Sequence, residues 1–282
     1  MRLENEAESE NVEDRRRRHL PGRRGAGLGC VGLLVVLGIS LATGIDPRRI
    51  LGLVGEVQEM TTSAPQPQAG PPIADDPETQ FVRKVLKTTE TSWKAIFAHS
   101  GSQYEEPTLV LFDGQVESAC GYASAAVGPF YCPSDRKVYL DLSFFRELNR
   151  RFGAPGDFAQ AYVVAHEIGH HVQNLLGVTD KVEALQRRAR SEEQANAYSV
   201  RLELQADCFA GVWGRSQQQI LDPGDIEEGL RAAAAIGDDV IQRRSEGHVA
   251  PETWTHGSSE MRMRWLKRGL ETGDPAACDS FK

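Results

Sequence analysis

The chain has 282 residues, of which 40% are hydrophobic and 26% are charged. This is a globular composition, and it excludes a wholly disordered or collagen-like chain. The net charge of −8 argues against a nucleic-acid-binding protein, because such proteins usually carry a basic excess.

Residues 1–24 contain seven Arg and six acidic residues, and the next segment, 25–45, has 21 residues without a charge. About 20 apolar residues cross a bilayer as a helix, so 25–45 is predicted to be one transmembrane helix in contact with the lipid bilayer. More Arg precede this segment than follow it. The positive-inside rule therefore predicts a single-pass protein of the cell membrane with a cytoplasmic tail at 1–24 and an extracytoplasmic remainder. A buried core helix or a cleaved signal peptide would be the alternatives.

Residues 46–80 are predicted to be a linker, since five Pro lie within 61–80. The domain that follows, 81–282, has about 200 residues, which is enough for one hydrophobic core. An oxidising compartment would allow two disulfides, and four Cys permit three pairings. The short separation favours Cys120–Cys132, which leaves Cys208–Cys278, and four free thiols are the alternative.

A helix is predicted from Asp157 to Gly177. Asp157 with Gln160 has the pattern of a capping box, 158–176 contain no Pro, and Gly177 is a typical helix stop. The residues that run into the middle of this helix are apolar, so we expect it to be largely buried.

This helix carries an H-E-x-x-H motif at His166, Glu167 and His170. Two His four residues apart project from one helical face and can hold one Zn²⁺ ion. Glu167 is rotated by about 100° from His166, which would let it take a proton from a zinc-activated water. Two His and one Glu on a solvated face are the alternative, but unpaired ionisable groups in a buried helix are costly.

A second helix is predicted from Ser191, where Gln194 completes a capping-box pattern, to about Gly214. Glu203 and Asp207 lie four residues apart on one face of this helix. Catalytic zinc takes three protein ligands, so Glu203 is the candidate third ligand, and Asp207 could accept the free N–H of a ligand His.

The chain resembles the neutral zinc metallopeptidases of bacteria, which are membrane-anchored proteins of gluzincin type. The resemblance covers nearly the whole chain and lies in NVEDRR, GIDP, CGYASAAVGPFYCPSDRKVYLDLSFF, HEIGHH, ELQADCFAGVW, PETWTHGSSEMRMRW and GDPAAC. It implies zinc on His166 and His170, a general base at Glu167, a third ligand at Glu203 and a supporting acid at Asp207. It also implies a mainly helical α+β fold, with a zincin-like domain and a small sheet after one transmembrane helix.

Other residues are candidates for the same site. His256 precedes a helix that Ser258 or Ser259 could cap, and it could stabilise the oxyanion of peptide hydrolysis, although a surface loop His is the alternative. Arg262 is a weaker candidate, and His171 is expected to be structural. A strand from 124–127 or 137–141 could pair with the substrate backbone, and an ordinary hairpin is the alternative.

These observations predict a membrane-anchored zinc metallopeptidase that hydrolyses peptide bonds in a peptide or unfolded protein. A catalytically inactive zinc-bearing domain that binds envelope or secreted proteins is one alternative, and a structural anchor without metal is another. The sequence does not determine the substrate, the cleavage specificity or the oligomeric state.

Overall fold

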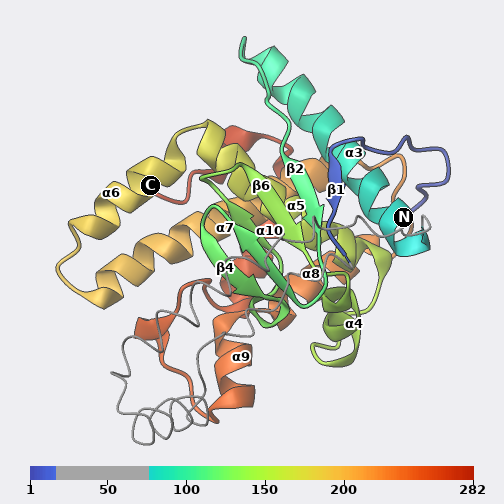
Figure 1. Cartoon of the computed structure of the whole chain (residues 1–282). Helices are drawn as coiled ribbons and strands as arrows, with labels where there is room; N and C mark the ends of the chain where they lie inside the picture. The colour runs from blue at the N-terminus through green and yellow to red at the C-terminus, as the bar shows by residue number, and fades with distance from the viewer. Residues whose placement is uncertain (17–75) are drawn as a thin grey trace, which may run out of the picture. The chain divides into compact units, whose positions relative to one another are not determined.

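Short segments of three or four residues form the strands of a small mixed sheet. The computed structural model describes residues 1–16 and 76–282. Among these, four strands pair in the order β1-β2-β6-β5, with β1, β2 and β6 parallel and β5 antiparallel to β6 (Figure 1). A separate antiparallel hairpin contains β3 and β4. The bounds are β1 Val12–Asp14, β2 Thr108–Leu111, β3 Gln115–Ser118, β4 Gly121–Ser124, β5 Phe130–Cys132 and β6 Lys137–Leu140.

Helices make up most of the remaining described chain, which confirms the predicted mainly helical α+β class. Three of them, α5, α7 and α10, carry the residues of the candidate site. The bounds are α3 Pro77–His99, α4 Ser143–Arg150, α5 Asp157–Leu175, α6 Val178–Arg187, α7 Glu192–Ser216, α8 Asp225–Ala235, α9 Asp238–Ser245 and α10 Ser259–Thr272. Short 3-10 turns span Ala125–Val127, Pro251–Thr253 and Pro275–Cys278.

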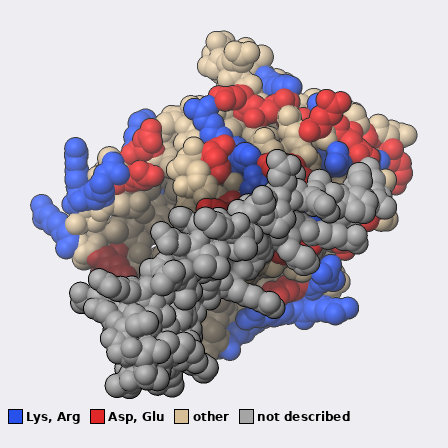
Figure 2. Space-filling model, viewed as in Figure 1, with Lys and Arg blue, Asp and Glu red and all other residues tan. Residues whose placement is uncertain are grey.

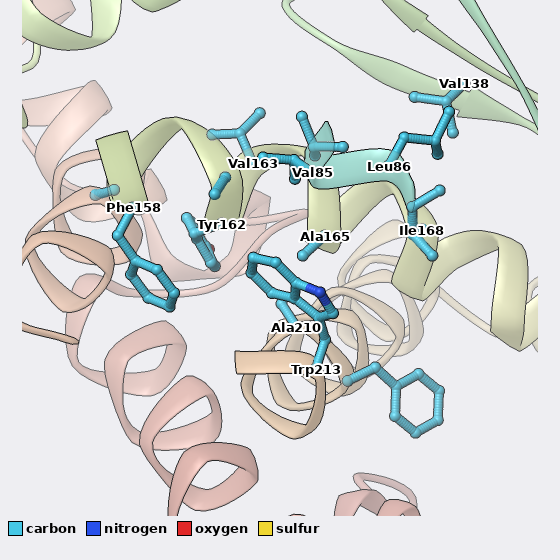
Figure 3. Packing of buried hydrophobic residues seen from close by; sticks show 14 of the residues in the cluster. Val85, Leu86, Val138, Phe158, Tyr162, Val163, Ala165, Ile168, Ala210 and Trp213 are labelled. Atoms are coloured by element: carbon cyan, nitrogen blue, oxygen red, sulfur yellow. The ribbon is translucent and has the colours of Figure 1, made fainter. Parts of the chain in front are cut away.

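The central helix α5 is buried over most of its length, as its apolar sequence predicted. It contacts β5 and β6 of the sheet as well as α3, α7 and α8. Figure 3 shows the indole ring of Trp213 reaching from α7 toward Ala165 and Tyr162 of α5. Trp213 is fully buried and stacks on Phe158 with ring centroids 5.9 Å apart. This packing fixes α5 and α7 against each other, and both predicted metal-ligand segments lie on these helices.

The predicted helix ends are close to those observed. Ser191 caps α7 by accepting a hydrogen bond from the backbone N–H of Gln194. α5 ends at Leu175, and Gly177 adopts the left-handed conformation, with φ of 68°. The capping box at Asp157 was wrong: Gly156 is the N-cap, and Asp157 begins the helix.

Two disulfides tie distant segments together, and both have the favoured pairing. Cys120–Cys132 joins the tip of the β3–β4 hairpin to the end of β5. Cys208–Cys278 joins the middle of α7 to the C-terminal 3-10 turn. In the entropic account, the longer loop of the second disulfide removes more freedom from the unfolded chain.

Helices α7 and α10 approach closely because glycine lies on both sides of their contact. A Cβ atom at Gly269 of α10 would overlap the carbonyl oxygen of Cys208, and one at Gly211 of α7 would overlap the carbonyl oxygen of Leu266. In both cases the neighbour is backbone, which cannot move aside as a flexible side chain can. The close approach brings Arg262 of α10 to the face of α7 that holds Asp207.

We therefore expect Gly269→Ala to lower the free energy of unfolding by about 2–3 kcal/mol, even though Ala favours helix formation. The exposed Arg264→Ala on the same helix is the control and should change it by less than about 0.5 kcal/mol. Urea denaturation measures both variants. Equal stability of Gly269→Ala and the parent chain would contradict the close contact.

The first fifteen residues pack on the rest of the domain, a contact that the sequence did not indicate. Residues 1–15 and 76–282 belong to one compact unit. β1 pairs with β2, and Leu3 is 7% exposed. The α-ammonium group of Met1 lies 2.6 Å from Asp157 and 3.2 Å from Asp225. Since Asp157 begins α5, this N-terminal arm supports the helix that carries the H-E-x-x-H motif.

A carboxylate of β1 makes the docking of this arm dependent on pH. Glu13 accepts hydrogen bonds from Arg15 and Lys137. The hydrogen bond from Arg15 is the largest effect and lowers the pKa of Glu13. Burial raises this pKa, and the hydrogen bond from Lys137 lowers it further, so that it falls to about 2. Ionised Glu13 therefore stabilises the folded state at pH values above its pKa in the unfolded chain, which is about 4.3. This stabilisation is lost as the pH falls through about 2.

We expect Glu13→Gln to lower the free energy of unfolding at pH 7 by about 1–2 kcal/mol, a figure reduced for the partial exposure of Glu13. Urea denaturation at several pH values should show the difference shrinking between about pH 4.3 and pH 2. The exposed Glu10→Gln is the control. A difference that stays constant over this range would contradict the assignment.

The predicted localisation is corrected by this packing. The prediction placed residues 1–24 in the cytoplasm and the domain on the other side of the membrane. β1, which lies within residues 1–24, pairs with β2 of the domain, and two strands on opposite sides of a membrane could not pair. Within residues 1–16 and 76–282, no helix combines the length and apolar character needed to cross a bilayer. The predicted transmembrane helix, 25–45, lies outside the described residues. Of the predicted linker, residues 77–80 belong to α3, so the folded part begins before residue 81.

Candidate metal centre

Three predicted ligands meet between α5 and α7. His166 Nε2 lies 3.1 Å from one carboxylate oxygen of Glu203, and His170 Nε2 lies 3.3 Å from the other. Donor atoms of the three residues all lie within 4.8 Å of one another. Gly169 permits this approach, because a Cβ atom there would be 2.9 Å from the carbonyl oxygen of Ala206.

The spacing of the donors fits a zinc ion. Zinc binds imidazole nitrogen and carboxylate oxygen at about 2.0–2.1 Å in tetrahedral geometry, which separates neighbouring ligand atoms by about 3.3–3.4 Å. Each His nitrogen lies close to this separation from one oxygen of Glu203, at 3.1 Å for His166 and at 3.3 Å from the other oxygen for His170. Two His and one carboxylate also leave one tetrahedral position for a water molecule, as in catalytic zinc sites.

Hydrogen bonds at the opposite ring nitrogens orient both His. His166 Nδ1 donates to Asp207 at 2.8 Å, and His170 Nδ1 donates to the side-chain oxygen of Gln173 at 2.9 Å. Both Nε2 lone pairs are thereby directed to the site, which is the arrangement that metal-binding His normally require. Gln173 is itself held, since its amide nitrogen donates to Leu202 O and to Gln205.

Asp207 is fully buried and joins three helices. Arg262 of α10 donates to both of its carboxylate oxygens, at 2.9 and 3.0 Å. The hydroxyl of Tyr162, on α5, also donates to Asp207. Arg262 is 3% exposed, so this bidentate pair is shielded from water on both sides.

The buried charges compensate one another. Burial would raise the pKa of Asp207, but Arg262 and then His166 lower it to about 2. Burial would also raise the pKa of Glu203, but His170 and His166 hold it well below its ordinary value. Both carboxylates are therefore ionised at neutral pH. Arg262 pairs with Asp207, and the carboxylate of Glu203 faces the two His.

The donors open into a cleft of about 830 Å³. Glu167, directly after His166, is 7% exposed and lines this cleft, as does His256. His256 Nδ1 lies 3.2 Å from Asp238, whose carboxylate also accepts the backbone N–H groups of Thr255, His256 and Gly257. Hydrogen bonding to Asp238 raises the pKa of His256 against the effect of burial.

The opposite wall of the cleft is the segment that leads into β5. Residues 125–131 line the cleft, and β5 is an outer strand of the described sheet. β6 lies between β2 and β5, so the predicted strand 137–141 exists but is not an edge. His171 is fully buried and structural, as expected: it lies 3.0 Å from the hydroxyl of Tyr131 and donates to Glu105 O.

Sequence reasoning missed Gln173 and underestimated Arg262. Gln173 lies three residues after His170 on the same helix, and this spacing could have indicated a hydrogen bond to a ligand. The position of Arg262 depends on how α10 packs against α7, and a single sequence gives no local signal for that contact.

The family comparison agrees with this geometry. A family model described as "Putative neutral zinc metallopeptidase" matches residues 1–281. The chain belongs to this family. It is 44% identical over 290 residues to "Uncharacterized protein YpfJ" of Escherichia coli K12, covering 100% of this chain and 99% of that protein. It is 46% identical over 215 residues to "Uncharacterized protein Rv2575" of Mycobacterium tuberculosis H37Rv, covering 72% of this chain and 71% of the relative. No solved structure matches the chain.

If Glu203 is a ligand, Glu203→Ala should weaken zinc binding by about 100-fold or more, since losing a residue that only orients a ligand already costs about 10- to 100-fold. Competition with a chromophoric chelator measures the affinity. The exposed Glu193→Ala, on the same helix, is the control and should bind zinc like the parent. Unchanged affinity in a folded Glu203→Ala protein would remove Glu203 from the ligand set.

Proposed function

We propose that this protein is a zinc-dependent metallopeptidase that hydrolyses peptide bonds with Glu167 as general base. The observation that carries the proposal is the convergence of His166, His170 and Glu203 on one point of a cleft that Glu167 also lines. The family description supports the zinc and the reaction class.

The residues His166, His170 and Glu203 would hold the zinc ion. When bound, zinc supplies a Lewis acid that polarises the peptide carbonyl and the attacking water. Asp207 and Gln173 keep the two His rings in the required tautomer and orientation. Arg262 keeps Asp207 ionised, and so preserves its hydrogen bond to His166.

Glu167 would take the proton of the attacking water at its carboxylate and then donate it to the leaving amine. Its position directly after His166 places it next to the ligand set without making it a fourth ligand. A single base that acts in both proton transfers contributes about 10²- to 10⁴-fold to the rate.

His256 would donate a hydrogen bond to the oxyanion that develops at the peptide carbonyl. Its Nδ1 donates to Asp238, and the opposite nitrogen, Nε2, acts as a donor when the ring is protonated. The raised pKa of His256 keeps this donor available toward neutral pH. It lines the same cleft as Glu167, so both groups can reach one bound substrate.

The substrate would be a peptide or an unfolded protein. An extended chain can pair with the outer strand β5, since strand addition supplies backbone hydrogen bonds whatever the side chains. The adjoining segment 125–129 consists of Ala, Val, Gly and Pro. Its short side chains leave the approach to Glu167 open.

Glu167→Gln is the direct test, and the full chain is the protein to use because residues 1–15 belong to the domain. We expect the variant to retain zinc and to cleave casein about 10²- to 10⁴-fold more slowly than the parent. The exposed Glu260→Gln is the control and should cleave like the parent.

Zinc content and casein cleavage are measured on the same preparations. Zinc in both proteins with cleavage by neither would contradict the peptidase and favour a zinc-bearing binding domain. A well-folded parent that takes up no zinc would contradict the metal centre itself.

A further inference from the structure

One end of the cleft is built from α4, from the two residues that follow it and from α9. Its side chains differ chemically from those of the candidate metal centre. The lining side chains there combine apolar surface with charge: Phe144, Glu147, Arg151 and Phe152 from α4 and its C-terminal extension, and Ile241 and Arg244 from α9. None of these residues takes part in the hydrogen bonds that orient the His ligands.

The apolar part consists of two aromatic and two aliphatic side chains. The rings of Phe144 and Phe152 are tilted against each other with centroids 6.4 Å apart. Ile241 is 39% exposed, and Val127 on the opposite wall is 69% exposed. Exposed apolar side chains that line a concave surface are typical of binding sites, where a ligand covers them.

The charged part is positive. Arg244 donates to the backbone oxygen of Arg151 at 2.9 Å, which holds the end of α9 against the end of α4, and both residues line the cleft. The guanidinium group of Arg151 lies 5.7 Å from the ring centroid of Phe152. Glu147 is the one carboxylate among the lining residues at this end, and it lies 3.9 Å from Arg151 with both side chains largely exposed. An exposed pair at this distance is weak, so the two Arg leave net positive charge.

Further Arg lie near this end of the cleft. Arg150 and Arg146, which lies 3.8 Å from Glu78, are on α4. Arg243 is in the last turn of α9, whose first turn holds Asp238 and Asp239. Figure 2 shows Lys and Arg side chains at the lower right, near the position of α4 in Figure 1, with Asp and Glu side chains beside them. The remaining Arg of the cleft, Arg262, is already paired with Asp207. A substrate carboxylate would therefore find its partners at the α4–α9 end.

We propose that this end of the cleft selects peptides in which a large apolar side chain stands next to Asp or Glu, with Arg244 and Arg151 as the residues that determine specificity. This inference rests on the proposed function, because it assumes that the cleft binds an extended peptide. The apolar side chain packs against Phe144, Phe152 and Ile241, and the carboxylate accepts hydrogen bonds from the guanidinium groups.

The test measures peptide binding to the zinc-loaded full chain carrying Glu167→Gln, so that cleavage does not interfere. The probes are labelled nine-residue peptides, acetylated and amidated to remove terminal charges, with a central Phe next to Glu-Glu, Gln-Gln or Lys-Lys, on either side. By fluorescence anisotropy we expect the better Glu peptide to bind about tenfold tighter than the Lys peptides, with Gln between them. Replacing Phe by Ala should weaken binding about tenfold.

Arg244→Glu should reverse this order, and Arg151→Glu should do so independently, which guards against a local distortion in either variant. The exposed Arg264→Glu, on α10 and outside the cleft lining, is the control and should leave the order unchanged. Thermal denaturation verifies that each variant is folded.

Equal affinities for the Glu and Lys peptides, no binding of any peptide, or an order that both cleft variants leave unchanged would overturn the inference. Cleavage by the parent chain separates it from the proposed function. Cleavage without any charge preference would leave the peptidase standing and contradict the subsite. The expected binding order without cleavage would leave the subsite standing and contradict the peptidase.

Discussion

The carboxylate of Asp207 is the group on which the arrangement of the three central helices depends. It is fully buried, and its partners come from α5 (His166 and Tyr162) and α10 (Arg262), while Asp207 itself lies on α7. A buried charge is costly unless it is paired and hydrogen-bonded, so the three helices must meet at this point or the carboxylate loses its compensation. Glycines at the helix contacts make the meeting sterically possible.

The cleft has two parts with different constraints. On the side of the proposed metal centre, buried hydrogen bonds from Asp207 and Gln173 fix the rings of His166 and His170. The α4–α9 end is formed by exposed charged side chains and by Phe144 and Phe152, which are half-buried. Substitutions at the second end can alter what the cleft binds without loss of the buried pairing, whereas substitutions at the first disturb the fold and the metal site together.

The parts of the structure that follow from local sequence could be predicted. H-E-x-x-H and Glu203 with Asp207 are spaced for one helical face, Ser191 caps its helix, and the cysteines were few enough for their pairing to be inferred. The pairing of β1 with β2 could not be predicted. A strand of three residues is too short to show a periodic pattern, and its partner lies nearly a hundred residues away in the sequence. The predicted cytoplasmic tail failed for the same reason: charge counting treats residues 1–24 as an independent tail and does not consider that residues 1–15 belong to the domain.

The residues that support the His rings also determine when, during synthesis of the chain, the proposed metal centre can form. A ribosome releases residues from the N-terminus onward, so α5 and much of α7 emerge before Arg262 and Cys278. Until α10 arrives, Asp207 has no guanidinium partner. Until the last turn arrives, Gln205 lacks the carbonyl of Cys278 that anchors it beside Gln173. A nascent chain therefore contains the three proposed ligands before the residues that orient them have been synthesised. The site can reach its observed arrangement only after α10 and the 3-10 turn at Pro275–Cys278 have been added.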